Sequence, residues 1–134
     1  MKQVLLAVDT DEERAREQAE TVIDLFDTES VEAHLFHVFG DNPEGASVGQ
    51  IAAVRRVSEQ LEEAGIETTL HEESGEPAET IVRRADELDV NAICVSGRKR
   101  SPTGKVLFGS VTQSVILNTE RPVLVAASTL TTGD

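Results

Sequence analysis

Short apolar runs alternate with amphipathic stretches along the chain, and this alternation restricts the possible folds more than any other feature of the sequence. The runs at 4–8 and 92–95 are continuously apolar, as expected of strands that are covered on both faces. The run at 66–71 alternates apolar with polar residues, which is typical of a half-exposed strand at a sheet edge. Two further runs, at 31–39 and 123–126, complete a set of five predicted strands.

Helix start and stop signals lie between these runs. A capping box consists of Ser or Thr followed three residues later by Glu or Gln, and it marks the start of a helix. Proline is favourable in the first turn of a helix, and glycine is favourable just after the last turn. The predicted boundaries are the boxes Thr10 with Glu13, Ser47 with Gln50 and Ser110 with Gln113, together with Pro77 as a start and Gly65 as a stop.

The resulting order βαβαβαβαβ predicts an α/β domain with an open parallel sheet and helices on both faces. The most apolar strands belong in the centre and the alternating strand at an edge, so the predicted strand order is 3-2-1-4-5. We expect one domain over residues 1–134, with a frayed polar tail at 128–134. In this topology a ligand lies beyond the carboxyl ends of strands 1 and 4, between the loops that follow Val8 and Val95.

The two loops at this crevice carry the candidate site residues. Asp9 follows strand 1 and could cap a helix, hold ribose hydroxyls or bind a phosphate-bound Mg²⁺. Four of the twelve basic residues fall between 98 and 105 in a chain of net charge −13, which favours either a phosphate ligand or a loop paired with neighbouring carboxylates. Gly109 and Ser110 could bring helix amides to a phosphate or form an ordinary turn and cap.

Composition limits the compartment and the partners. Twenty-five acidic residues stand against twelve basic ones, which disfavours nucleic acid and anionic membranes as partners and suggests adaptation to a saline cytoplasm, as in a halophile. An ordinary acidic mesophilic protein is the alternative. We find no apolar run long enough to span a membrane and no signal peptide, and the single cysteine, Cys94, falls in an apolar run that predicts a buried core thiol. A cytoplasmic location is expected.

The sequence motifs of several specific binding sites and enzyme classes are incomplete or absent. Gly104 and Lys105 do not form a phosphate-binding P-loop, because Val106 stands where Ser or Thr is required. No G-x-G-x-x-G follows strand 1, no G-x-S-x-G elbow is present, and the pattern of a response regulator is incomplete. His34 and His37 lie three apart on one strand and so face opposite sides, with His71 on another strand, so spacing predicts no metal cluster.

The segment from Gly97 to Ser110 resembles the nucleotide loop of the universal stress protein (UspA-like) family. The resemblance extends over nearly the whole chain, through Val8-Asp9, His37-Val38, Gly109-Ser110-Val111-Thr112 and Arg121-Pro122-Val123-Leu124-Val125. It implies a Rossmann-like fold of the adenine nucleotide alpha hydrolase type and a homodimer through strand 5 at about Val123–Ala126. It also implies that the protein is a stress-response module rather than an enzyme, and that it binds ATP or AMP, with Mg²⁺ brought by the nucleotide. Slow ATP hydrolysis is the enzymatic alternative.

Carried over residue by residue, the resemblance implies a nucleotide site formed by Ala7, Val8, Asp9, Val38, Ser96, Gly97, Arg98, Arg100, Gly109, Ser110, Val111 and Thr112. The family's ATP-binding pattern has a second glycine three residues after the first, where this chain has Arg100 after Gly97. The separation of Gly97 from Gly109 is also one residue shorter than the separation of the corresponding glycines in the pattern. Arg100 could hold phosphate itself. Alternatively, the altered loop closes the site and leaves a dimeric interaction protein without a nucleotide.

Overall fold

The computed structural model describes residues 1–39, 51–97 and 108–126, and helices and strands alternate throughout these ranges. The elements are β1 (Lys2–Ala7), α1 (Glu12–Leu25), β2 (Val31–Phe39), α2 (Ala52–Glu63), β3 (Glu67–Ser74), α3 (Pro77–Leu88), β4 (Ala92–Ser96), α4 (Ser110–Asn118) and β5 (Val123–Ala126). Strands 2 and 5 have the predicted limits. Strand 3 extends three residues beyond its predicted end at 71.

The sheet has the predicted order, β3-β2-β1-β4-β5, with every neighbouring pair parallel. β1 pairs with β2 along its full length but with β4 only from Val4 to Leu6. Beyond that point Val8 donates its N–H to the Phe36 carbonyl, and Gly97 donates to the Ala126 carbonyl. The two central strands therefore separate at their carboxyl ends, where the topology predicts a crevice.

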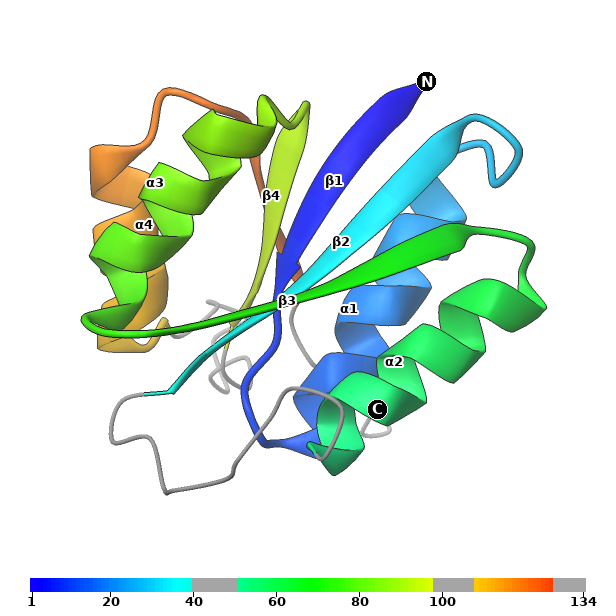
Figure 1. Ribbon diagram of the computed structural model, residues 1–134, viewed down its shortest axis with the longest axis horizontal. Coiled ribbons are helices and arrows are strands. Elements are labelled where there is room, and N and C mark those ends of the chain that lie inside the picture. Colours follow the sequence, from blue (N-terminus) through cyan, green and yellow to red (C-terminus); the bar gives the residue numbers. More distant parts are fainter. Residues whose placement is uncertain (40–50, 98–107, 127–134) are drawn as a thin grey trace, which may run out of the picture.

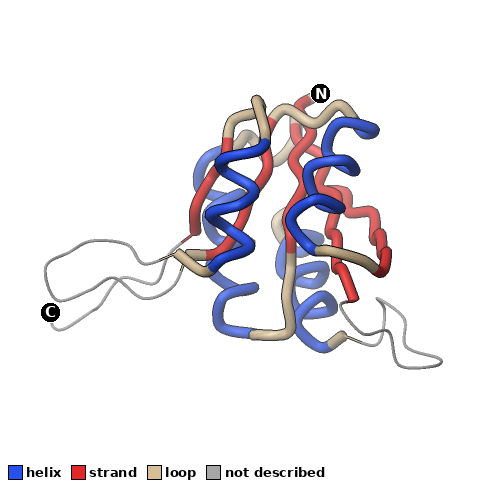
Figure 2. The backbone as a smooth tube through the Cα atoms, turned by 90° about the vertical axis from the view of Figure 1, so that its left-hand side faces the viewer, coloured by secondary structure: helices blue, strands red, loops and turns tan. Residues whose placement is uncertain are grey.

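Two helical layers enclose the sheet, with α1 and α2 on one face and α3 and α4 on the other (Figure 1). Figure 2 turns the molecule so that α3 and α4 face the reader and run alongside the strands behind them. Side chains of β1 alternate between the two cores: Val4 and Leu6 pack with α1 and α2, whereas Leu5 packs with α3. A strand buried on both sides explains why this run is continuously apolar.

Two predicted stop and start signals are confirmed. Gly65 follows α2 with φ +91°, a conformation that a side chain would strain. Pro77 occupies the first turn of α3, and the side chain of Glu76 caps that helix by accepting the N–H of Glu79 at 2.6 Å.

Two predicted capping boxes are wrong. Asp11, not Thr10, caps α1, because its carboxylate accepts the N–H of Arg14 at 2.9 Å. At α4 the cap position belongs to Gly109, Ser110 is already helical, and no side chain among the described residues caps the helix. The third box, Ser47 with Gln50, lies outside the described residues, as does the tail at 128–134.

A buried amide links the two central strands just below the point where they separate. Gln18 of α1 is fully buried, and its Nε2 donates to the carbonyls of Ala7 at 2.9 Å and Cys94 at 3.2 Å. Cys94 is the last residue of β4 that pairs with β1, and Ala7 is the first residue of β1 beyond that pairing. Gln18 therefore supplies a donor that the sheet itself no longer supplies.

No helix in the described ranges combines the length and apolar character needed to cross a bilayer.

Candidate functional site

A cleft of about 240 Å³ lies at the carboxyl ends of β1, β2 and β4, where the central strands separate. Its walls come from these strand ends, from the first turns of α1 and α4, and from the start of α3. The lining residues are Ala7, Val8, Asp9, Arg14, Phe36, His37, Val38, Pro77, Ile81, Val95, Ser96, Gly109, Ser110, Val111 and Thr112. Helices that follow parallel strands begin at this edge, so three helix N-termini surround one cleft.

The lining combines an apolar surface with a few polar groups. Phe36, Val95 and Ile81 are buried core residues whose outer atoms reach the cleft. A flat apolar ring fits such a surface, while polar groups at the rim fix its orientation. His37 is buried beside this surface, and its Nδ1 lies 2.8 Å from the Val8 carbonyl. This contact joins the end of β2 to the end of β1.

The start of α4 presents backbone N–H groups at the cleft. Its cap residue Gly109 is extended (φ −76°, ψ 169°) and carries no side chain that could accept from those amides. The hydroxyl of Thr112 donates to the Ser96 carbonyl at 2.8 Å and so fixes the first turn of α4 against the end of β4. N-terminal amides that no described side chain caps, together with the positive end of the helix dipole, are groups that can hold an anion.

Asp9 does not cap α1 directly. Its Oδ1 accepts the N–H of Asp11 at 2.8 Å, and its Oδ2 accepts from Nε (3.2 Å) and Nη2 (3.0 Å) of Arg14. The Asp9 side chain is 51% exposed and lines the cleft, so further ligands can reach its oxygens. The carboxylate is therefore held in one orientation by the loop and by Arg14.

Nine of the twelve predicted site residues line this cleft: Ala7, Val8, Asp9, Val38, Ser96, Gly109, Ser110, Val111 and Thr112. Gly97 is buried just beyond β4, where its N–H bonds to Ala126, and it does not line the cleft. Arg98 and Arg100 lie outside the described residues.

Six lining residues were not predicted: Arg14, Phe36, His37, Pro77, Ile81 and Val95. Three of them could have been predicted from the sequence. Phe36 and His37 directly precede Val38, and the predicted start of a helix at Pro77 belongs at the same sheet edge as the other helix starts. Arg14 carried no such signal, since its contact with Asp9 depends on the turn between them.

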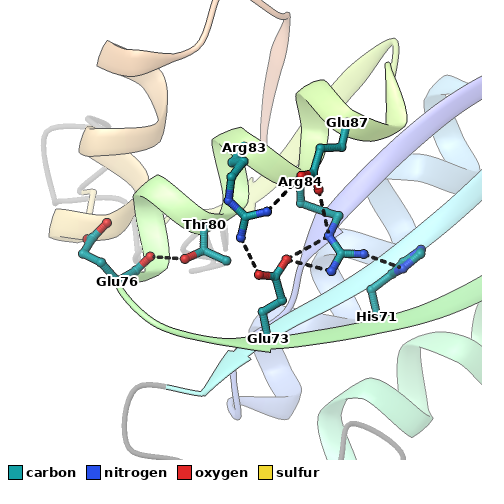
Figure 3. A network of polar contacts seen from close by, with 7 residues as sticks. All are labelled: His71, Glu73, Glu76, Thr80, Arg83, Arg84 and Glu87. Atoms are coloured by element: carbon teal, nitrogen blue, oxygen red, sulfur yellow. Dashed lines mark hydrogen bonds and ion pairs between the residues drawn. The ribbon is translucent and has the colours of Figure 1, made fainter.

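A second polar cluster, which we call the histidine relay, links β1, β2, β3 and α3 away from the cleft. His71 Nε2 lies 3.0 Å from His34 Nδ1, and His34 Nε2 lies 2.8 Å from Gln3 Oε1. On its other side, His71 Nδ1 lies 3.3 Å from Arg84 Nη1. Figure 3 shows Arg84 between His71 and Glu73.

Arginine can only donate, and this fixes every proton in the relay. His71 Nδ1 must accept from Arg84, so His71 carries its proton on Nε2 and donates it to His34. His34 then donates from Nε2 to Gln3. Both rings are neutral in this arrangement, because an added proton on either would face another donor. The sequence separated these histidines onto different strands, but the register places His71 diagonally beside His34 on one face.

Burial lowers the pKa of both rings, and neighbouring groups lower that of His71 further. Desolvation is the main cause for His34, opposed by Glu32 at 3.9 Å. Desolvation, then His34, then Arg84 lower the pKa of His71. The hydrogen bond from Arg84 is the largest influence on Glu73 and lowers its pKa. Cys94 is a core thiol as predicted: it is fully buried, and burial raises its pKa to about 12.

Arg83 and Arg84 fasten α3 to the edge strand through Glu73. Arg84 Nε and Nη2 donate to Glu73 Oε2 at 3.0 and 2.7 Å, and Arg83 donates to the other oxygen (Figure 3). The Arg84 guanidinium also lies over the Phe36 ring, 5.3 Å from its centroid. These contacts hold the second half of α3 against the sheet, and the first turn of the same helix forms one wall of the cleft.

Comparisons with known proteins agree with this architecture. A universal stress protein from Mycolicibacterium smegmatis is 30% identical over 86 residues, a match that spans 63% of this chain and 66%, slightly under two-thirds, of that protein. The structure of a universal stress protein from Archaeoglobus fulgidus matches with a TM-score of 0.75 at 30% identity, and the match covers 93% of this chain and 98% of the Archaeoglobus fulgidus chain. Another from Archaeoglobus fulgidus, solved in complex with dAMP, has a TM-score of 0.70 at 23% identity, with coverage of 93% and 97%.

The sequence also matches the model of the family described as "Universal stress protein family" from residue 1 to residue 127. This match extends over all five strands and all four helices of the described chain. The chain therefore belongs to the universal stress protein family.

Proposed function

We propose that this protein binds an adenine nucleotide, ATP or AMP, in the cleft between β1 and β4 and acts as a stress-response or regulatory module. The observation that carries the proposal is the combination of an apolar cleft with the uncapped N-terminus of α4 at its rim. A nucleotide carries an aromatic base at one end and phosphate at the other, joined by ribose, and the cleft offers complementary surfaces to the base and the phosphate. Related universal stress proteins solved with dAMP, AMP and cyclic AMP support this assignment.

Each candidate residue has a proposed role. Ala7 and Val8 would line the adenosine side, and the backbone of Val38 would meet the adenine. Asp9 would hold ribose hydroxyls or a Mg²⁺ that the phosphates bring. Ser96 and Arg98 would approach ribose and phosphates, with Arg100 as a further phosphate ligand, and Gly97, which does not line the cleft, would shape the loop that carries them. The amides of Gly109, Ser110, Val111 and Thr112 would hold the phosphates.

Calorimetric titration of ATP with Mg²⁺, and of AMP, into the protein at molar potassium chloride tests this proposal. We expect saturable binding that Gly109→Val abolishes, because the added side chain would stand among the amides that meet the phosphate. Ser114→Val, one turn further along α4 and outside the cleft, is the matched control and should bind normally. A folded wild-type protein that binds neither ligand would overturn the proposal.

The second candidate function is a dimeric interaction protein without a nucleotide. Its motivation is the altered loop, in which Arg100 stands where the family pattern has glycine. The sheet edge at β5, a short apolar strand whose outer side pairs with no other described strand, supports the dimer itself. We propose a homodimer through Val123–Ala126 under either function. Sedimentation at high salt should give a dimer, and a monomer at all concentrations would refute the interface. A dimer that binds no nucleotide would favour this second function.

We propose a binding rather than an enzymatic role. Asp9 is the one carboxylate among the described lining residues, and its oxygens are already engaged by Asp11 and Arg14. It is therefore poorly placed as a general base. Slow hydrolysis of ATP is the alternative, and release of phosphate over hours by the wild type but not by Asp9→Asn would demonstrate it.

The remaining proposals concern the setting of the protein. We propose a single domain in a saline cytoplasm, as in a halophile, because the net charge of −13 favours high salt and the lone cysteine is a buried thiol. Nucleic acid and membranes are not proposed as partners. The melting temperature should rise with potassium chloride, and a maximum at low salt would contradict the saline setting.

A further inference from the structure

Arg14 occupies a place in the cleft that the proposed function does not yet use. It is the third residue of α1, and its side chain is 32% exposed. Among the described residues that line the cleft it is the one guanidinium, as Asp9 is the one carboxylate. The two meet through two hydrogen bonds to a single oxygen, Asp9 Oδ2.

The acidic segment that opens α1 shows why this contact matters. Asp9, Asp11, Glu12 and Glu13 place four carboxylates within five residues at the rim of the cleft. Each has an arginine partner: Glu12 contacts Arg56 at 2.8 Å, Glu13 contacts Arg16 at 2.5 Å, and Asp9 and Asp11 share Arg14 at 3.0 and 3.6 Å. Of these three arginines, only Arg14 lines the cleft.

The charge of Asp9 works against a phosphate ligand. Two negative charges at the separations found inside such a cleft repel each other appreciably, since the walls have a lower effective dielectric constant than water. A guanidinium held at 3.0 Å from that carboxylate cancels most of its field. The same contact, together with the Asp11 amide on the other oxygen, fixes the plane of the carboxylate.

We propose that Arg14 is a positioning and specificity-determining residue of the cleft: by holding Asp9 and cancelling its charge, it lets the cleft accept a phosphorylated nucleoside in preference to the unphosphorylated one. The proposal rests on the proposed function, because it concerns the same ligand. A purely structural ion pair at a partly exposed position would stabilise the loop slightly and would not alter the choice between ligands.

Titrations with adenosine and with AMP, without Mg²⁺, separate these roles. The variants are Arg14→Gln, Asp9→Asn and the double variant, with Arg16→Gln as a matched control on the same helix outside the cleft. Titrations use the lowest potassium chloride concentration at which thermal melting shows every variant folded, so that charges are screened as little as possible.

We expect Arg14→Gln to weaken AMP binding by about tenfold and adenosine binding by less than about threefold, because only AMP carries the charge that an unpaired Asp9 repels. Adding Asp9→Asn should restore the AMP-to-adenosine preference, since the repelling charge is gone. Arg16→Gln should leave both affinities unchanged.

Equal losses for adenosine and AMP in Arg14→Gln, or no restoration in the double variant, would overturn the role of Arg14 while leaving nucleotide binding intact. A wild-type protein that binds neither ligand would overturn the proposed function, and the role of Arg14 with it.

Discussion

Two regions of the molecule differ in whether their polar groups are paired with one another. In the histidine relay and the ion pairs around Glu73, donors and acceptors meet in an ordered chain from Arg84 to Gln3. At the cleft, no described side chain caps the first amides of α4. Helix α3 contributes to both regions, because Pro77 at its start lines the cleft and Arg84 farther along contacts the relay.

The contrast separates stability from binding. Polar groups that satisfy one another hold the strands and α3 in place but have nothing left to offer a ligand. Uncapped amides beside an apolar wall weaken the helix end slightly and remain available. We therefore expect substitutions in the relay to change stability and substitutions at the start of α4 to change binding.

Gln18→Leu should have the largest effect on stability, although Gln18 lies beneath the cleft. Leucine fills the space but removes the donor that serves the carbonyls of Ala7 and Cys94. Leaving such groups unsatisfied costs about 1–3 kcal/mol. Urea unfolding measures the loss, with Gln60→Leu on α2 as a half-buried control that should change stability by less than about 0.5 kcal/mol. Equal effects at both sites would mean that the amide is not structural.

Acid should weaken the fold through the relay. Both histidines have a lowered pKa in the folded state. Below about pH 6.5 these histidines therefore become protonated in the unfolded chain while they remain neutral in the folded protein. Stability is therefore complete above this pH and falls as the pH drops toward the native pKa values. The charges around the rings are Arg84, Arg83 and Glu87 on α3, Glu32 on β2 and Glu73 on β3.

Urea unfolding at pH 7.5, 6.5 and 5.5 measures this dependence. The free energy of unfolding should decrease across the series for the wild type and less steeply for His71→Gln, which has one fewer group to protonate. Glu73 acts in a separate window below about pH 4.5, where its own lowered pKa makes stability fall further. Parallel curves for both proteins would show that the relay does not control the acid response.

Glu73→Gln should have the smallest effect and gives the sharpest contrast with the cleft. It removes the partner of Arg83 and Arg84 at a partly exposed position, so the loss of stability should be about 1 kcal/mol or less. Nucleotide affinity should change by less than about twofold, since Phe36 and the backbone still seat α3. A large loss of affinity without a loss of stability would contradict the separation of the two regions.

The sequence was sufficient for the sheet because burial controls apolar patterning. The continuous run at 4–8 and the alternating run at 66–71 predicted the central and edge positions of β1 and β3, and both are confirmed. Helix caps were less predictable, because several polar residues compete within one or two positions. Asp11 displaces Thr10, and Gly109 displaces Ser110, through differences in local backbone angle that composition does not reveal.

The cleft was predictable as a location but not as a set of contacts. Topology alone places the ends of β1 and β4 together, which is why the predicted residues of those ends are found there. The pairing of Asp9 with Arg14 and the relay between His34 and His71 depend on side-chain geometry and strand register. Neither leaves a periodic signal in the sequence.

The most direct test of the separation between cleft and relay is an amide chemical-shift titration of the isotope-labelled protein with AMP. We predict saturable shifts for Asp9, Val38, Ser96 and the first turn of α4, with little change for Thr69, His71 and Glu73 on β3. Shifts centred on β3, or an absence of saturable shifts anywhere in the folded protein, would contradict the assignment of the cleft as the nucleotide site.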